Sequence, residues 1–244
     1  TEQYVVFWAS KLKTGGKQRL YYATTRDFYT FSDAQVWFEE DGSVIDTTVI
    51  KVDDWYYRYT KNEDGNTNTY GTPSKRIYCE KSKSLTAPAE DWELVYNNCL
   101  NVGGGQIEGG CIFEINTEDV ENAKKIAALK GYELKGDRIF ALVADATGKT
   151  IFPGLSDNIT TGQFNVLGTE ANASVNGTPL YSMPEPAASH GTIMPITSDE
   201  YDNLMKKYNS RKYTAAIKKL VDKAVSLSDT SNVTSDITLP AETT

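Results

Sequence analysis

The stretch Val44–Lys61 constrains the fold more than any other part of this sequence. Its first half is a run of apolar, mostly β-branched residues that surrounds a single acid, Asp46. A polar segment at 51–54 then leads into a run in which aromatic and polar residues alternate. This pattern predicts a β-hairpin whose first strand carries Asp46. Because a carboxylate is unfavourable among apolar neighbours, we expect Asp46 to be paired or functional.

A second acid occurs in a similar setting at 106–113, where Glu108 precedes an apolar strand. Segment 76–80 has the same pattern as 20–24, and a third, degraded copy runs over 139–194. Repeats of roughly 55–80 residues, each with a few antiparallel strands, are typical of propeller blades. The sequence therefore predicts an all-β fold of the five-bladed β-propeller type, with about three blades visible in this chain and a C-terminal helical segment.

Helical spacing of apolar residues predicts two helices, one at 117–129 with Thr117 as its N-cap and one that opens with a cap at Ser198. We expect residues 1–208 to form a partial propeller, with a C-terminal helix at 209–225 packing on it. The Ser/Thr/Asp-rich segment 226–244 is predicted to be a linker towards a further module.

Composition excludes several classes of function. The net charge of −8 argues against a nucleic-acid partner, because phosphate binding needs a basic surface. No apolar run approaches the length of a membrane helix, so no membrane association is expected. The chain has a single histidine, His190, and therefore no zinc site with several histidines. Its three cysteines show no metal-binding spacing and are too few for a disulfide framework.

The segment Tyr22–Phe28 and four further segments together resemble glycoside hydrolase family 43, most closely its arabinofuranosidase and β-xylosidase types. The four segments are Ser43–Thr48, Tyr56–Lys61, Ile107–Gly109 and Ser189–Thr192. The resemblance covers about residues 4–208, with the segments in the family's order.

The resemblance implies a glycosidase that works by inversion and carries its acids at one end of a propeller channel. Glu108 matches the general acid, and Asp46 matches the carboxylate that orients this acid and keeps it protonated. His190 matches a channel histidine that in many members lies near a bound calcium ion. Inversion needs a second carboxylate about 6.5–9.5 Å from the acid to activate water.

The expected substrates are arabinofuranosyl or xylosyl residues of plant cell-wall polysaccharides and oligosaccharides such as arabinan, arabinoxylan and xylan. A bacterial protein that is secreted or displayed on the cell surface is expected. Candidate substrate-binding residues are Trp8, Thr47, Arg58 and Gln106. Packing between blades is an equally good interpretation of Trp8.

The chain departs from the family in one important respect. No Asp-Pro motif of the general base precedes Asp46, and Asp145, another candidate, has no motif support. We therefore expect that the N-terminal blades are absent from this piece, or that the protein has lost them together with the base. The alternative function is a non-catalytic or truncated propeller that binds glycan or protein.

Each site residue also has a purely structural interpretation. Asp46 would then bond to the hydroxyl of Thr47 or Thr48. Glu108 would be an acid of the glycine-rich loop that precedes it, and His190 would have a packing role.

Overall fold

The computed structural model describes residues 3–103, 105–146, 150–168, 174–175, 178–179 and 190–208. The chain forms two compact units, Thr1–Met194 and Pro195–Thr244. The first unit holds every described strand and helix α1, and the second holds helix α2. The helix predicted at 209–225 and the linker predicted at 226–244 lie outside the described residues.

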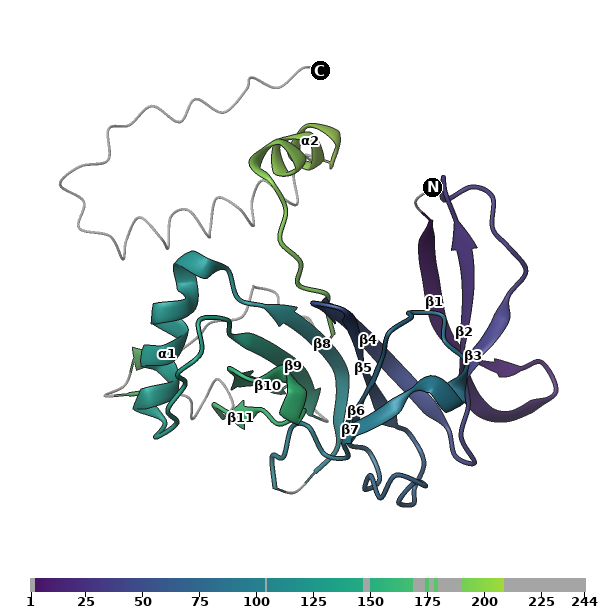
Figure 1. Ribbon diagram of the computed structural model, residues 1–244, viewed down its shortest axis with the longest axis horizontal. Helices are drawn as coiled ribbons and strands as arrows, with labels where there is room; N and C mark the ends of the chain where they lie inside the picture. The colour runs from purple at the N-terminus through teal and green to yellow at the C-terminus, as the bar shows by residue number, and fades with distance from the viewer. Residues whose placement is uncertain are drawn as a thin grey trace. The chain divides into compact units, whose positions relative to one another are not determined.

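Three antiparallel sheets make up most of the described part of the first unit (Figure 1). The first sheet contains β1 (Tyr4–Leu12), β2 (Gly15–Thr25) and β3 (Gln35–Phe38). The second contains β4 (Val44–Val52), β5 (Trp55–Asn62), β6 (Ile77–Ser82) and β7 (Glu93–Tyr96). The third contains β8 (Ile107–Glu114), β9 (Phe140–Ala146), β10 (Thr150–Ser156) and β11 (Asn165–Val166). A short hairpin pairs β12 (Ser174–Val175) with β13 (Thr178–Pro179).

Chain order and strand order agree in all three sheets, so each sheet is a meander in which neighbouring strands are joined directly. The hairpin predicted at 44–61 is confirmed as β4 paired with β5, and its turn uses Asp53 at φ +54°. The all-β, antiparallel class is therefore confirmed, whereas the closure of a propeller and its number of blades stay predictions. Segment 191–194, assigned by its sequence to the third repeat, is described without a strand.

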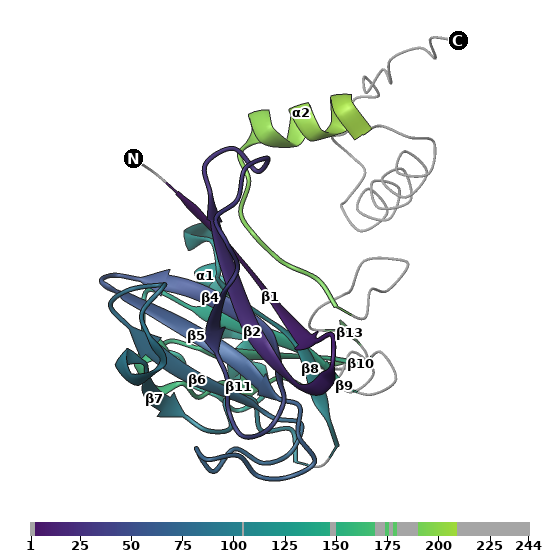
Figure 2. The same cartoon turned by 90° about the vertical axis from the view of Figure 1, so that its right-hand side faces the viewer.

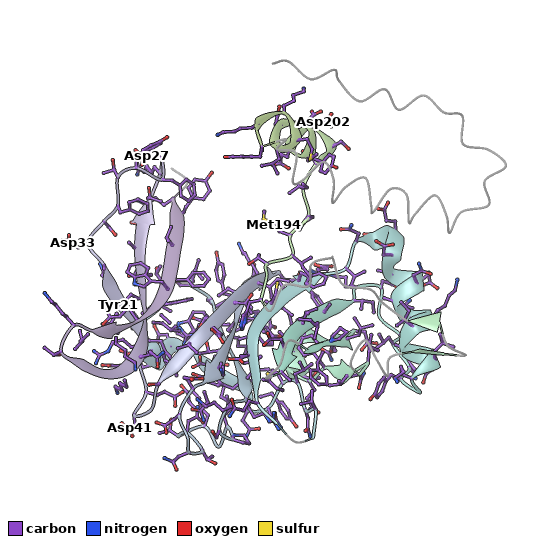
Figure 3. The ribbon with its side chains drawn as sticks, turned by 180° about the vertical axis from the view of Figure 1, so that it is seen from behind. Tyr21, Asp27, Asp33, Asp41, Met194 and Asp202 are labelled. Carbon is purple, nitrogen blue, oxygen red and sulfur yellow. The ribbon has the colours of Figure 1, made fainter. Side chains whose placement is uncertain are left out.

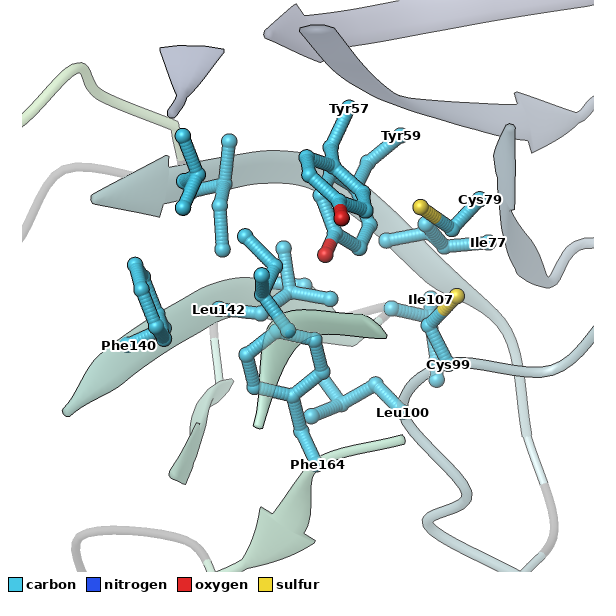
Figure 4. Close-up of a cluster of buried hydrophobic side chains, with 14 residues drawn as sticks. Tyr57, Tyr59, Ile77, Cys79, Cys99, Leu100, Ile107, Phe140, Leu142 and Phe164 are labelled. Atoms are coloured by element: carbon cyan, nitrogen blue, oxygen red, sulfur yellow. The ribbon is translucent and has the colours of Figure 1, made fainter. Parts of the chain in front are cut away.

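The second sheet is covered on both faces by its neighbours (Figure 2). On one face, Tyr57 and Tyr59 of β5 belong to the same cluster of buried side chains as Phe140 and Leu142 of β9, which Figure 4 shows. On the other face, β3 and its neighbours form a second cluster: Leu20, Trp37, Phe38, Val44, Tyr78, Ala87 and Trp92. Because side chains alternate along a strand, both the aromatic and the polar residues of β5 become buried.

Arg58 of β5 is fully buried, and it is paired with Glu80 of β6. Its Nε and Nη2 donate to Glu80 Oε2 at 3.1 and 2.8 Å, and the Tyr70 hydroxyl donates to Glu80 Oε1 at 2.9 Å. Three aromatic rings lie 4.0–4.9 Å from the guanidinium: Trp92, Phe38 and Trp37. This ion pair is part of the core between the first and second sheets.

Both predicted helices are present, with different caps from those expected. Helix α1 (Val120–Leu129) follows a 3-10 turn at Thr117–Asp119, and its N-cap, Asp119, makes no side-chain capping bond. The predicted Thr117 cap is therefore wrong. Helix α2 (Ser198–Tyr208) is capped one residue earlier than predicted, since the Thr197 hydroxyl accepts from the Glu200 amide while Glu200 accepts from the Thr197 amide. Two more 3-10 turns lie at Ala89–Asp91 and Ile159–Thr161. Among the described residues, no helix has the length and apolar character that crossing a membrane requires.

We predict that Glu80→Gln destabilises the protein by about 3–5 kcal/mol, because it leaves the buried Arg58 cation without its counter-charge. Urea unfolding measures the loss. Glu133→Gln is the matched control, since its partner Lys135 and Glu133 are both exposed and their pair is worth no more than about 1 kcal/mol. Equal stabilities of the two variants would contradict the structural role of the buried pair.

Candidate functional site

Asp46 lies where β4 is bulged. The pairing of β4 with β5 shifts register between Ile45 and Thr48, and Asp46 adopts φ +50°, a conformation that non-glycine residues seldom take. Bulges and strained backbone of this kind re-aim a side chain away from the regular pleat. Here the carboxylate is turned towards β8 of the next sheet.

Glu108 occupies the equivalent place in β8. The pairing of β8 with β9 shifts register between Glu108 and Cys111, and Gly109 has φ +62°. The Gly109 amide donates to Asp46 Oδ2 at 3.0 Å, and the Ile112 amide donates to Thr48 Oγ1 at 3.3 Å. These two bonds join β4 to β8 and hold the two acids beside each other.

Neither acid makes the contacts that its purely structural interpretation requires. Thr47 Oγ1 lies 3.0 Å from Thr60 Oγ1, and Asp46 accepts from an amide 63 residues away instead of from a neighbouring hydroxyl. Glu108 belongs to a strand rather than to the preceding loop. Its side chain is one-third exposed, so it remains open to a ligand.

Lys61, the penultimate residue of β5, places a buried ammonium between the acids. Its side chain is 2 % exposed, and Nζ lies 3.1 Å from Glu108 Oε2 and 3.9 Å from Asp46 Oδ2. A third carboxylate, Glu63, lies 2.7 Å from the same Nζ and also 2.7 Å from Lys75 Nζ. Burial alone would lower the pKa of Lys61, but its carboxylate partners, chiefly Glu63 and Glu108, outweigh burial and raise it. Lys61 is therefore charged in this cluster.

His190 packs directly on Gly109. A Cβ atom on Gly109 would lie 1.7 Å from His190 Nδ1, so the imidazole occupies the space that a side chain would need. The amide of Ile193, three residues further on, donates to Cys111 Sγ at 3.2 Å. The segment from His190 to Ile193 thus runs beside β8 and brings the histidine to the acids.

Asp145 also belongs to this cluster, although no motif identifies it. It lies directly opposite Glu108 in the β8–β9 ladder, is 3 % exposed, and has Oδ2 3.7 Å from His190 Nε2. Burial raises the pKa of Asp145; the nearby carboxylates Glu108 and Asp46 raise it further, and His190 and Lys61 oppose the change. Cross-strand pairing with a suspected acid was the one signal from which sequence reasoning could have found it.

The calcium ion expected near His190 stays a prediction. Calcium takes six to eight oxygen ligands, and no group of three or more His, Cys, Asp or Glu side chains within the described ranges is arranged to hold a metal. We therefore derive no step from a bound metal.

The remaining predicted residues are not all brought to the cluster. Thr47 is part of the Asp46 bulge, and Gln106 is exposed just before β8. Trp8 lies on β1, is 38 % exposed, and stacks on Tyr21 with ring centroids 6.0 Å apart; Figure 3 labels Tyr21 on this sheet. Among the residues that the structure describes, no hydrogen bond or ion pair joins Trp8 to the acids.

The prediction that Arg58 binds substrate is corrected by the structure. Its guanidinium is fully buried and held by Glu80, so it presents no donor to a ligand. The physical reason is that β5 is an inner strand of a sheet covered on both faces, which buries even its polar positions.

Two sequence comparisons bear on this arrangement of acids. A family model described as "Probable glycosyl hydrolase domain", from a family related to glycoside hydrolase family 43, matches residues 1–202. An α-L-arabinofuranosidase of Bifidobacterium longum is 32 % identical over an alignment of 187 residues, and the match covers 66 % of this chain and 17 % of that protein. The chain therefore spans only 17 % of the length of this curated relative.

Similarity to solved structures is lower. A thermostable family-43 glycoside hydrolase matches with 12 % identity and a TM-score of 0.46, over 74 % of this chain and 53 % of that one. An N-acetylgalactosamine deacetylase from F. plautii matches with 12 % identity and a TM-score of 0.43, over 74 % of this chain and 50 % of that one. At these TM-scores the solved structures decide nothing about the site.

We predict that Gly109→Ala displaces His190, since the new methyl group would overlap the imidazole. The chain has one histidine, so side-chain ¹⁵N resonances of a histidine-labelled sample report on His190 alone. Gly131→Ala is the matched control, because Gly131 also has a positive φ (+82°) but open space at its Cβ. Both variants carry backbone strain of about 1–2 kcal/mol, and only Gly109→Ala is expected to shift the histidine resonances. Identical histidine spectra would contradict the contact.

We predict that Asp145→Asn becomes more stable relative to the wild type as the pH rises from about 3 to about 7. The pKa of Asp145 is raised in the folded chain above the unfolded value of about 3.9. The folded state then binds more protons than the unfolded chain between the two values, and wild-type stability falls as the pH rises through that window. Urea unfolding at several pH values measures the difference. A difference that stays constant with pH would show that the carboxyl is not destabilised by burial.

Proposed function

Because the chain belongs to the family described as "Probable glycosyl hydrolase domain", which is related to glycoside hydrolase family 43, we propose that it hydrolyses O-glycosyl bonds. Glu108 is the general acid, and Asp46 is the carboxylate that orients it. The observation that carries this proposal is the convergence of the two acids, from strands of different sheets, at the Gly109–Asp46 hydrogen bond.

The proposed reaction is a single displacement. Glu108 gives its proton to the glycosidic oxygen, and the bond between this oxygen and the anomeric carbon breaks with its electron pair going to the oxygen. Water forms the new bond to the anomeric carbon and loses its proton to a second carboxylate. Asp46, accepting from the Gly109 amide, fixes the backbone that carries Glu108.

The general base stays unassigned. Of the further carboxylates in this cluster, Glu63 is paired with two lysines, and Asp145 is buried on the same rung of the ladder as Glu108. The Asp145 side chain is 3 % exposed, with Oδ2 3.7 Å from His190 Nε2, so it is not open to a water molecule beside a substrate. Neither residue is therefore proposed as the base.

The proposed substrates carry terminal arabinofuranosyl or xylosyl residues, as in arabinan, arabinoxylan and xylan. The name of the Bifidobacterium relative, an α-L-arabinofuranosidase, supports the arabinofuranosyl choice. A polymer of this kind lies outside the cell, so a secreted or cell-surface location in a bacterium is part of the proposal. A five-bladed propeller would provide the second side of the substrate site. A calcium ion, which the resemblance implies, has no support from the described residues.

The unassigned base favours one alternative, a domain that binds glycan without turnover. The two functions can be separated by adding azide, an anionic nucleophile that attacks the anomeric carbon without needing a base. A catalytic acid then yields a glycosyl azide, whereas a binding domain yields no product.

We predict that Glu108→Gln lowers turnover of aryl α-L-arabinofuranosides or β-D-xylosides, with azide present, by about 10²–10⁴-fold, since general acid catalysis contributes that much. Released aryl alcohol is the measured quantity. Glu114→Gln is the control, because it makes the same change on the same strand where the partner is Arg138.

Unchanged turnover in Glu108→Gln would exclude Glu108 as the acid. A folded wild-type chain that binds arabinoxylan but releases no aryl alcohol, with or without azide, would favour the binding function.

A further inference from the structure

Lys61 is the feature of this site that the proposed function leaves unexplained. The resemblance gives it no role, although its ammonium is buried and lies closer to Glu108 than to Asp46, at 3.1 and 3.9 Å. A buried lysine is unfavourable unless its charge is paired throughout its working cycle. The charge that each of its partners carries during the proposed reaction therefore decides what Lys61 does.

Glu63 provides the pairing that does not change during the reaction. It lies 2.7 Å from Lys61 Nζ, and Lys75 holds its other oxygen at 2.7 Å. Burial favours the protonated form of Glu63, but the ammonium groups of Lys61 and Lys75 outweigh this and lower its pKa. Glu63 is consequently a fixed anion, and Lys61 stays paired whether Glu108 is neutral or charged.

Glu108, by contrast, changes charge. It begins the proposed reaction as a neutral acid and becomes a carboxylate once its proton has passed to the leaving oxygen. An ammonium at 3.1 Å, with little water around it, interacts strongly with the carboxylate and weakly with the neutral acid. The contact is therefore strengthened as the glycosidic bond breaks.

Building on the proposed function, we propose that Lys61 is a positioning residue of the reaction that holds Glu108 and stabilises the carboxylate formed when Glu108 releases its proton. Lys61 touches neither substrate nor nucleophile in this role. Its charge acts through Glu108 alone, and Asp46 at 3.9 Å is a secondary partner.

This role predicts that the loss of rate on removing Lys61 depends on the leaving group. A 2,4-dinitrophenolate departs without being protonated, whereas an alkoxide needs the proton from Glu108. Loss of Lys61 should therefore slow the cleavage of alkyl and unsubstituted phenyl glycosides and leave the cleavage of 2,4-dinitrophenyl glycosides nearly unchanged. A lysine that only supported the fold would affect all substrates equally.

The test measures kcat/KM of the full chain for a series of α-L-arabinofuranosides and β-D-xylosides, with sodium azide as the nucleophile. Lys61→Met should lower the value about 10–100-fold for the poorest leaving group, the worth of a hydrogen bond to a charged group. For the 2,4-dinitrophenyl glycoside the loss should stay below about threefold. Lys75→Met is the matched control, because Lys75 also pairs with Glu63 and, within the described part of the chain, makes no ion pair or hydrogen bond with Glu108.

Two further variants keep the test decisive. Lys61→Gln retains a donor without the charge, and it should reproduce the leaving-group dependence even if Lys61→Met does not fold. Glu108→Gln should show the same dependence more steeply. An equal loss across the series in the Lys61 variants would overturn this inference and leave the proposed function intact. Turnover retained in Glu108→Gln, or no turnover by the folded wild type, would overturn the proposed function and this inference with it.

Discussion

The candidate site depends on the hydrogen bond from the Gly109 amide to the Asp46 carboxylate. It connects two sheets at residues 63 positions apart in the chain, and both of its ends lie at register shifts. In regular strands, each of these two side chains would follow the alternation of its own strand. The two bulges turn them towards each other, and Gly109 is needed because its φ is positive and the His190 ring fills the place of a side chain.

The two buried cations of β5 differ in the number and the exposure of their carboxylate partners. Arg58 is fully buried, with the Glu80 carboxylate at 2.8 Å and aromatic rings around it, and neither member of this pair is exposed to solvent. Lys61 is as deeply buried but faces three carboxylates, of which Glu108 is one-third exposed. A cation that keeps one fixed partner and shares another with solvent can respond to a proton transfer, which the Arg58 pair cannot do.

Repetition explains why acids from different sheets meet. β4 and β8 are the first strands of meanders with the same strand order, and each carries its acid at the second or third residue, next to a bulge. The similarity of 76–80 to 20–24 makes β6 the counterpart of β2, and therefore β5 the counterpart of β1. The first sheet, as described, thus has no counterpart of β4, and the described strands supply two such acids.

The sequence by itself determined the local elements and the two acids. Alternating residues and turn residues predicted the β4–β5 hairpin, helical spacing predicted both helices, and an acid inside an apolar strand marked Asp46 and Glu108. The resemblance already assigned His190 to the channel with the acids, whereas the burial of Arg58 and the positions of Asp145 and Lys61 beside the acids come from the tertiary structure. Periodicity describes one strand, whereas burial and electrostatic pairing depend on which strands and sheets become neighbours. That choice is made by contacts far apart in sequence, such as the hydrogen bond between Asp46 and Gly109.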